Sequence, residues 1–151
     1  MLIVEDDPND VLLLDRALTR MKEKCPFHIL SKSEEVMEYF YGRGKYSCRE
    51  NFPIPDLMLV DVRLAGFSGF DILRWVRNHP EIQRLPVILW SSSCEAAEVG
   101  NAYHLGANSF LTKPVDFTEL QKLMTRLHSF WCARPEHPDF PRGRNGSFES
   151  C

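Results

Sequence analysis

Short apolar runs alternate with amphipathic segments along most of this chain. Five runs of three to six residues suit buried strands, and each is followed by residues with helical spacing. In segment 11–24, for example, Val11, Leu14, Leu18 and Met21 recur at helical spacing. The predicted strands are 2–4, 27–30, 56–61, 86–90 and 109–112, and the predicted helices are 11–24, 33–42, 69–80, 95–106 and 116–131.

Polar residues mark where these elements begin and where the chain leaves them. Asp7, directly before a proline, predicts the N-cap of the first helix. Asp116 and Glu119 predict a variant of the capping box at the start of the last helix. Residues 42–55 are rich in glycine, proline and polar side chains, and they predict one long loop.

Strands that alternate with helices predict an α/β fold with a parallel sheet covered by helices on both faces. The chain has 151 residues, of which 44% are hydrophobic and 26% charged, so one ordinary domain over 1–131 is expected. Residues 132–151 are rich in proline and small polar side chains, and we expect a largely disordered tail. The first apolar run is short for a central strand, so we expect a residue or two upstream of it.

Charge and cysteine content narrow the classes of partner. The formal net charge of −3 provides no basic field for non-specific nucleic-acid binding. The five cysteines are odd in number and form no CxxC pair, so we expect ordinary thiols in a cytoplasmic protein. No apolar stretch approaches the roughly 20 residues that cross a bilayer, and we expect no membrane partner.

Residues whose side chains can take part in binding or catalysis lie at the ends of the predicted strands. Ligand chemistry in such a sheet belongs at the carboxyl ends of the strands. Glu5 and Asp6 follow the first strand, Asp61 ends the third, Ser91 follows the fourth and Lys113 the fifth. Each residue alone has a structural explanation, such as a turn, a cap or a solvated side chain. Their joint occurrence at four strand ends weakens those explanations together.

The residue types point to one kind of reaction. Three carboxylates at one sheet edge repel one another, and a hard divalent cation such as Mg²⁺ offsets that repulsion. A lysine supplies a point charge for a phosphoryl oxygen, and a serine hydroxyl can donate to another. The set therefore predicts Mg²⁺-dependent phosphoryl transfer onto a carboxylate.

Four motifs in order, VEDD, LMLVD with the loop VRLAGFSGFDIL, PVILWSSS and FLTKP, resemble the receiver domain of two-component response regulators. The resemblance covers residues 1–131 and implies a flavodoxin-like (βα)5 fold with strand order 2-1-3-4-5. The loop 42–55, the stretch NHPEIQRLPVI and the ending SFW resemble, more weakly, the small single-domain regulators partnered with bacterial phytochrome-type kinases.

The resemblance also implies a metal site around a phosphoacceptor. Asp61 would accept the phosphoryl group and would also bind Mg²⁺. Asp6 would be a direct Mg²⁺ ligand, Glu5 would act largely through water, and Arg63 would offer its backbone carbonyl. Lys113 would contact the phosphoryl group.

A switch and a special peptide bond are implied in the same way. The Ser91 hydroxyl would move toward the phosphoryl oxygen, and the Phe110 ring would turn inward, which changes the face formed by the fourth helix, fifth strand and fifth helix. Core packing explains Phe110 equally well. The peptide bond between Lys113 and Pro114 would be cis.

The implied partners are proteins. A sensor histidine kinase or phosphotransfer protein would donate the phosphoryl group, and a downstream protein would read the result. The protein would be a bacterial phosphoacceptor and no enzyme, beyond its own Mg²⁺-dependent phosphorylation and dephosphorylation. A homodimer through the fourth or fifth helix stays open, because core packing explains the same apolar residues.

Rival functions fit less well. A haloacid-dehalogenase-type phosphatase or a Toprim enzyme would need an acid where Arg63 stands. A flavin carrier would need a hydroxyl-rich phosphate loop, whereas the acids of EDDPND would repel the flavin phosphate. A pseudo-receiver, which shares the fold but acts without phosphorylation, remains the alternative.

Overall fold

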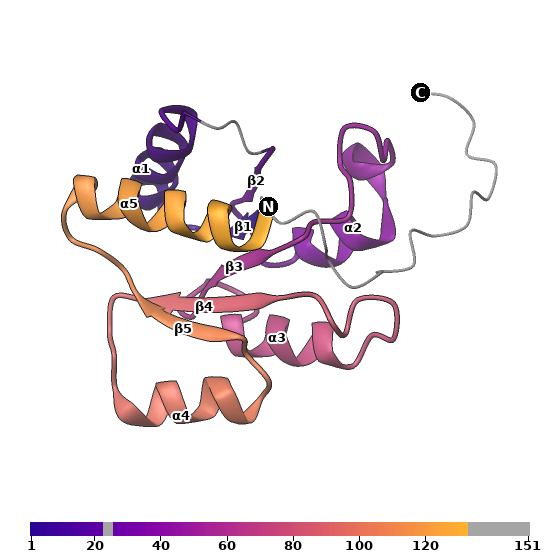
Figure 1. The fold of residues 1–151 in the computed structure, drawn as a ribbon. Helices are drawn as coiled ribbons and strands as arrows, with labels where there is room; N and C mark the ends of the chain where they lie inside the picture. The colour runs from indigo at the N-terminus through magenta and orange to yellow at the C-terminus, as the bar shows by residue number, and fades with distance from the viewer. Residues whose placement is uncertain (23–25, 133–151) are drawn as a thin grey trace.

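The computed structural model describes residues 1–22 and 26–132, which form a central parallel sheet with helices on both sides (Figure 1). The strand order β2-β1-β3-β4-β5 confirms the expected flavodoxin-like arrangement. The strands are β1 Leu2–Val4, β2 His28–Leu30, β3 Met58–Asp61, β4 Val87–Ser91 and β5 Ser109–Thr112. The helices are α1 Pro8–Thr19, α2 Glu35–Tyr41, α3 Gly69–Arg77, α4 Ala96–His104 and α5 Phe117–Leu127, with a 3₁₀ turn η1 Gly44–Tyr46 and a π-helical turn η2 His128–Cys132.

The first helix begins as predicted but ends early. Asp7 caps α1, because its carboxylate accepts the amides of Asn9 and Asp10 at 2.8 and 3.2 Å. The helix stops at Thr19, so the prediction of helix as far as residue 24 is wrong for the described residues after Thr19. Met21 nevertheless packs against the core from the turn that follows, which explains why it continues the apolar periodicity.

The last helix carries half of the predicted capping box. The Asp116 carboxylate accepts the amides of Thr118 and Glu119 at 2.8 and 3.1 Å. The Glu119 carboxylate instead pairs with Lys122 at 2.8 Å, along its own helix.

Each face of the sheet has its own hydrophobic core, because successive side chains of a strand point to opposite faces. Ile3, Leu59 and Trp90 pack beneath α1 and α5. Val60 and Leu89 pack on the opposite face, which α2, α3 and α4 cover. Figure 1 shows α1 beside α5 on one side of the sheet and α3 and α4 on the other.

The long loop between α2 and β3 is partly ordered by aromatic packing. It contains the 3₁₀ turn η1, which the sequence did not predict. Tyr46 in this turn is buried, with its ring 5.2 Å from that of Tyr39. The Arg49 guanidinium donates to the carbonyls of Tyr39, Phe40 and Phe52. It thus satisfies carbonyls at the end of α2 and fixes the loop to it.

Two expectations about the chain concern its cysteines and its tail. Cys48 is disulfide-bonded, so the expectation of ordinary thiols is wrong at this position, whereas Cys94 is free and exposed. The predicted tail 132–151 lies outside the described residues, apart from the backbone of Cys132.

Candidate functional site

Three carboxylates meet where β1 and β3 end. Val4 pairs with Val60 in parallel register, so Glu5, directly after β1, lies beside Asp61, the last residue of β3. Glu5, Asp6 and Asp61 each offer one oxygen, and these atoms all lie within 4.8 Å of one another. Glu5 and Asp61 are buried, whereas Asp6 is partly exposed.

The Lys113 ammonium, just beyond the end of β5, contacts three carboxylates. Its Nζ lies 2.7 Å from Glu5 Oε2, 2.8 Å from Asp10 Oδ2 and 3.1 Å from Asp61 Oδ2. It also lies 5.0 Å from the centre of the Trp90 ring. The ammonium donates hydrogen bonds to Glu5 and Asp10 and lies at ion-pair distance from Asp61.

Asp10 is a member of the site that sequence reasoning missed. Its position in the first turn of α1 has a sufficient structural explanation in the helix dipole. The sequence did offer one signal, the negative charge of Asp10, because this residue lies in the first turn of the helix that follows the acids after β1. Its distance from Lys113 in the chain gave no hint of the contact.

Burial and charge set the pKa values of this cluster. Burial raises the pKa of Glu5 to about 7, although its hydrogen bond to Lys113 opposes the shift. Burial opposes the charge on Lys113, but its hydrogen bonds to Asp10 and Glu5 raise its pKa above the usual range. For Glu5, the cost of burying a carboxylate thus outweighs the attraction of the Lys113 ammonium.

The loop after β3 holds two of these acids through its backbone. The Ala65 amide donates to Asp6 Oδ2 at 2.7 Å, and the Arg63 amide donates to Asp61 Oδ1 at 3.2 Å. The Arg63 side chain points elsewhere, since its guanidinium lies 3.5 Å from Glu98 on α4. The side chain thus leaves the Arg63 backbone as the part of this residue nearest the acids.

The donor set suits a hard divalent cation. All the acidic ligand atoms are carboxylate oxygens, which Mg²⁺, Ca²⁺ and Mn²⁺ prefer over softer ions. Four carboxyl groups, those of Glu5, Asp6, Asp10 and Asp61, gather around the single ammonium of Lys113, so acidic groups are in excess over basic ones. A divalent ion held by Glu5, Asp6 and Asp61 would offset most of that excess.

The two residues of the implied switch lie at neighbouring strands. Ser91 is fully buried at the end of β4, where its hydroxyl accepts the amide of Ser93 at 3.2 Å. Phe110 in β5 is half-buried and pairs with Leu89 of β4 in register. Its ring packs against the core beneath α2, α3 and α4.

The expected cis bond is wrong for this structure. The described residues contain no cis peptide bond, so the bond between Lys113 and Pro114 is trans. The trans form is the intrinsically preferred one before proline, by roughly 0.5–1 kcal/mol. Lys113 reaches its three carboxylates from the trans backbone, so these contacts do not require the cis form.

Within the described part of the chain, none of the helices is both long and apolar enough to span a membrane.

Comparisons with known proteins agree with this geometry. Residues 1–125 match the family model of the response regulator receiver domain. The curated response regulator Rcp1 of Synechocystis sp. is 30% identical over 131 residues, which cover 87% of this chain and 87% of Rcp1. The Mn²⁺-bound structure of Rcp1 is similar with a TM-score of 0.76 and 29% identity, over 91% of this chain and 97% of that one.

Two further solved structures are similar over 91% of this chain. The phosphorylated cyanobacterial phytochrome response regulator RcpA has a TM-score of 0.79 and 26% identity, over 96% of its own chain. The response regulator RPA3017 in red light signaling of R. palustris has a TM-score of 0.81 and 27% identity, over 97% of its chain. This chain therefore belongs to the response regulator receiver domain family.

Proposed function

We propose that this protein is a response regulator that takes a phosphoryl group onto Asp61 in a Mg²⁺-dependent reaction. The observation that carries the proposal is the 3.1 Å contact between Lys113 and Asp61 inside a cluster that also contains Glu5 and Asp6. Acceptor, charge-neutralising lysine and metal-type carboxylates are thus within reach of one another. We also propose that the protein acts in the cytoplasm, as phosphoacceptor and not as an enzyme on other substrates.

The chemistry follows from these contacts. A carboxylate oxygen of Asp61 attacks the phosphorus, the bond from phosphorus to the donor breaks, and the leaving group keeps the electron pair. Asp61 Oδ1 is held by the Arg63 amide, and Oδ2 faces Lys113. Lys113 offsets negative charge beside the reacting carboxylate and supplies a donor to a phosphoryl oxygen.

Mg²⁺ would be held by Glu5, Asp6, Asp61 and the Arg63 carbonyl. When bound, it supplies positive charge to the phosphoryl oxygens and to the acids around them. The charge excess of the cluster and its all-oxygen donor set support this assignment. The Mn²⁺-bound form of Rcp1 shows that a relative of this chain binds a divalent ion.

The response would be a change at the surface formed by α4, β5 and α5. The buried Ser91 hydroxyl would leave the Ser93 amide and donate to a phosphoryl oxygen on Asp61. Space vacated by this movement would let the half-buried Phe110 ring turn inward. A downstream protein would then read the altered surface.

The donor would be a histidine kinase or a phosphotransfer protein. Rcp1 and RcpA are similar to this chain over most of its length, and RcpA is a phytochrome response regulator. RPA3017 acts in red light signaling. A phytochrome-type histidine kinase is therefore the donor to test first.

The test measures intact mass over time after addition of Mg²⁺ and acetyl phosphate. We expect the wild type to gain one phosphoryl group, and we expect no gain without Mg²⁺. Asp61→Asn removes the nucleophile and should gain nothing. Asp56→Asn is the matched control, because Asp56 is an exposed acid just before β3 and should leave the gain unchanged.

The outcome separates two functions. Phosphorylation that persists in Asp61→Asn would contradict the choice of acceptor. A wild type that neither gains mass nor binds Mg²⁺ would favour a pseudo-receiver that acts through protein contacts alone.

A further inference from the structure

Ser33, between β2 and α2, carries a buried hydroxyl that the proposed function does not use. Only 1% of the residue is exposed. A serine just before a helix usually caps it, but α2 has no side-chain cap, and the Ser33 hydroxyl lies 3.4 Å from Glu34 Oε2 and makes its shorter hydrogen bonds with a distant loop. Its hydroxyl donates to the Ala65 carbonyl at 2.8 Å and accepts the Phe67 amide at 2.9 Å, 32 and 34 residues away.

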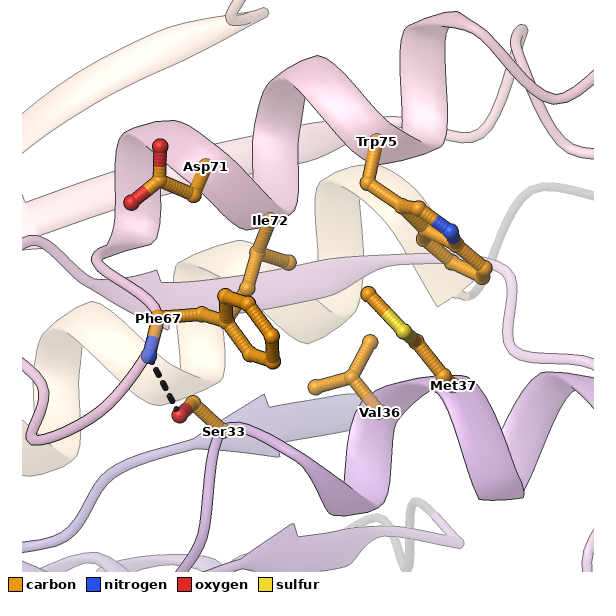
Figure 2. A pocket seen from close by; sticks show the side chains of 7 residues that line it. All are labelled: Ser33, Val36, Met37, Phe67, Asp71, Ile72 and Trp75. Atoms are coloured by element: carbon orange, nitrogen blue, oxygen red, sulfur yellow. Dashed lines mark hydrogen bonds between the residues drawn. The ribbon is translucent and has the colours of Figure 1, made fainter.

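These two hydrogen bonds tie the β2–α2 loop to the loop that follows Asp61. Figure 2 shows the Phe67 amide pointing at the Ser33 hydroxyl, while the Phe67 ring lies toward Val36 and Ile72. The cavity beside them has a volume of about 20 Å³, room for a single water and for no larger ligand. The hydroxyl therefore serves the protein itself.

Gly66 lies between Ala65 and Phe67, the two residues that are hydrogen-bonded to Ser33, and it shows how closely the loops approach. Gly66 has φ +81°, which a side chain rarely adopts. A Cβ on this residue would collide with the Glu34 carboxylate and would lie 2.8 Å from Ser33 Oγ. The side chains of Ser33 and Glu34 thus lie directly against the Gly66 backbone.

The same loop segment reaches the acidic cluster. Ala65 is held by Ser33 through its carbonyl, and its amide donates to Asp6 Oδ2 at 2.7 Å. Arg63, whose amide bonds to Asp61, lies two residues earlier. A chain of short hydrogen bonds therefore runs from Ser33 through Ala65 to Asp6.

We propose that Ser33 is a positioning residue that holds the Ala65 amide on Asp6 and so orients this carboxylate for a divalent cation. The inference rests on the proposed function, because it assigns a role toward the metal of that same site. Partners that orient a metal ligand typically change affinity about 10- to 100-fold when they are removed. Ser33 acts through one peptide unit, so we expect the lower end of that range.

The first measurement is calorimetric titration of the full chain with Mg²⁺. Ser33→Ala should raise the Kd for Mg²⁺ about 10-fold. Ser33→Thr keeps the hydroxyl and should restore most of the affinity. At saturating Mg²⁺, phosphorylation of Ser33→Ala by acetyl phosphate should return to within about twofold of the wild-type rate, because Asp61 and Lys113 are untouched.

The matched control is Tyr39→Phe. Tyr39 is also 1% exposed, and its hydroxyl donates to the Pro53 carbonyl at 2.8 Å. Its ring lies 5.9 Å from that of His28, the first residue of β2, whereas the acids lie at the other end of the strands. Tyr39→Phe should lower the melting temperature about as much as Ser33→Ala does, but it should keep the wild-type Kd for Mg²⁺. Gly66→Ala perturbs the loop contact without changing Ser33, and it should also weaken Mg²⁺ binding.

A second measurement needs no metal. In metal-free protein, amide hydrogen exchange at Ala65 and Phe67 should be faster in Ser33→Ala than in the wild type or Tyr39→Phe. A Kd in Ser33→Ala within twofold of wild type, or unchanged exchange at these amides, would overturn the inference. A wild type that does not bind Mg²⁺ would overturn the proposed function instead, whatever the exchange rates show.

Discussion

The Asp10 carboxylate and the Lys113 ammonium lie 2.8 Å apart, although 103 residues separate them in the chain. This ion pair joins the first turn of α1 to the end of β5. It also keeps the ammonium beside Glu5 and Asp61, because the three acids surround the same nitrogen. The contact therefore links the position of α1 to the position of the lysine.

Replacing Asp10 should loosen that link without removing the acceptor. In Asp10→Asn we expect a loss of about 1 kcal/mol in the free energy of unfolding, since a charged hydrogen bond becomes a neutral one. Phosphorylation at Asp61 should persist. Urea unfolding in EDTA measures the loss, and Asp15→Asn, an exposed acid on the same helix, is the control. Equal losses in the two variants would show that the Lys113 contact contributes nothing.

The pH dependence of stability should carry the signature of Glu5. Its folded pKa of about 7 lies above the ordinary value of 4.5, so the folded state binds this proton more tightly than the unfolded state does. Its stabilising effect should be fully present below pH 4.5 and be lost as pH rises through about 7. In metal-free protein, the unfolding free energy of wild type relative to Glu5→Gln should fall by roughly 3 kcal/mol across that window. A difference that is flat with pH would contradict this pKa.

Divalent cations should stabilise the folded protein. A ligand that binds only the native state at ten times its Kd adds about 1.4 kcal/mol. We expect Mg²⁺ to raise the melting temperature of the wild type and EDTA to reverse the effect. Asp61→Asn should respond less, because one carboxylate of the cluster is gone. An equal response to Mg²⁺ in the two proteins would place the ion elsewhere.

The Ser91 hydroxyl should affect the rate of phosphorylation and not its site. Ser91→Ala should take the phosphoryl group onto Asp61 about tenfold more slowly, since it loses one hydrogen bond to a charged group in the transition state. Ser93→Ala is the control, because its amide, and not its side chain, bonds to Ser91. Wild-type rates in Ser91→Ala would remove this serine from the reaction.

Arg77 should matter for stability alone. Its guanidinium donates to the carbonyls of Gln83, Leu85 and Gly106 and to the Asn108 side chain, at 2.8 to 2.9 Å. Arg77→Met removes the donor from the three carbonyls, although Asn108 Oδ1 keeps its bond from the Val87 amide, and should cost about 2–3 kcal/mol in unfolding free energy. The Kd for Mg²⁺ should stay at the wild-type value. A changed Kd would mean that the Arg77 contacts, which lie before β4 and β5, affect the acids at the carboxyl ends of the strands.

Sequence patterns were sufficient for the parts of this molecule that follow a regular period. Apolar runs predict the strands, and the position of ligand chemistry at the carboxyl ends of parallel strands predicts that Glu5, Asp6, Asp61 and Lys113 lie together. Residues with two adequate explanations were harder. Asp10 already suited a helix start, and its partner Lys113 lies just beyond the end of β5, far away in the chain.

Contacts between loops and the geometry of single bonds had no such pattern. A serine before a helix predicts a cap, so nothing local indicated that Ser33 bonds to Ala65 and Phe67. The Lys113–Pro114 bond was expected to be cis from resemblance alone, and the chain has the trans form. Met21 continues the apolar periodicity of α1, and so the pattern predicts more helix than the chain has. The side chain packs against the core from a turn, which the pattern does not distinguish from a helix.

The two separate cores have a consequence for how a signal can travel. Asp61 lies two residues after Leu59, on the side of the sheet that α1 and α5 cover, whereas Ser91 lies two residues after Leu89, on the side that α4 covers. Under the proposed function, the direct path from Asp61 to α4 therefore runs along the carboxyl edge of the sheet, where β3 and β4 both end. Core substitutions far from that edge are then expected to lower the free energy of unfolding without altering the proposed response to phosphorylation.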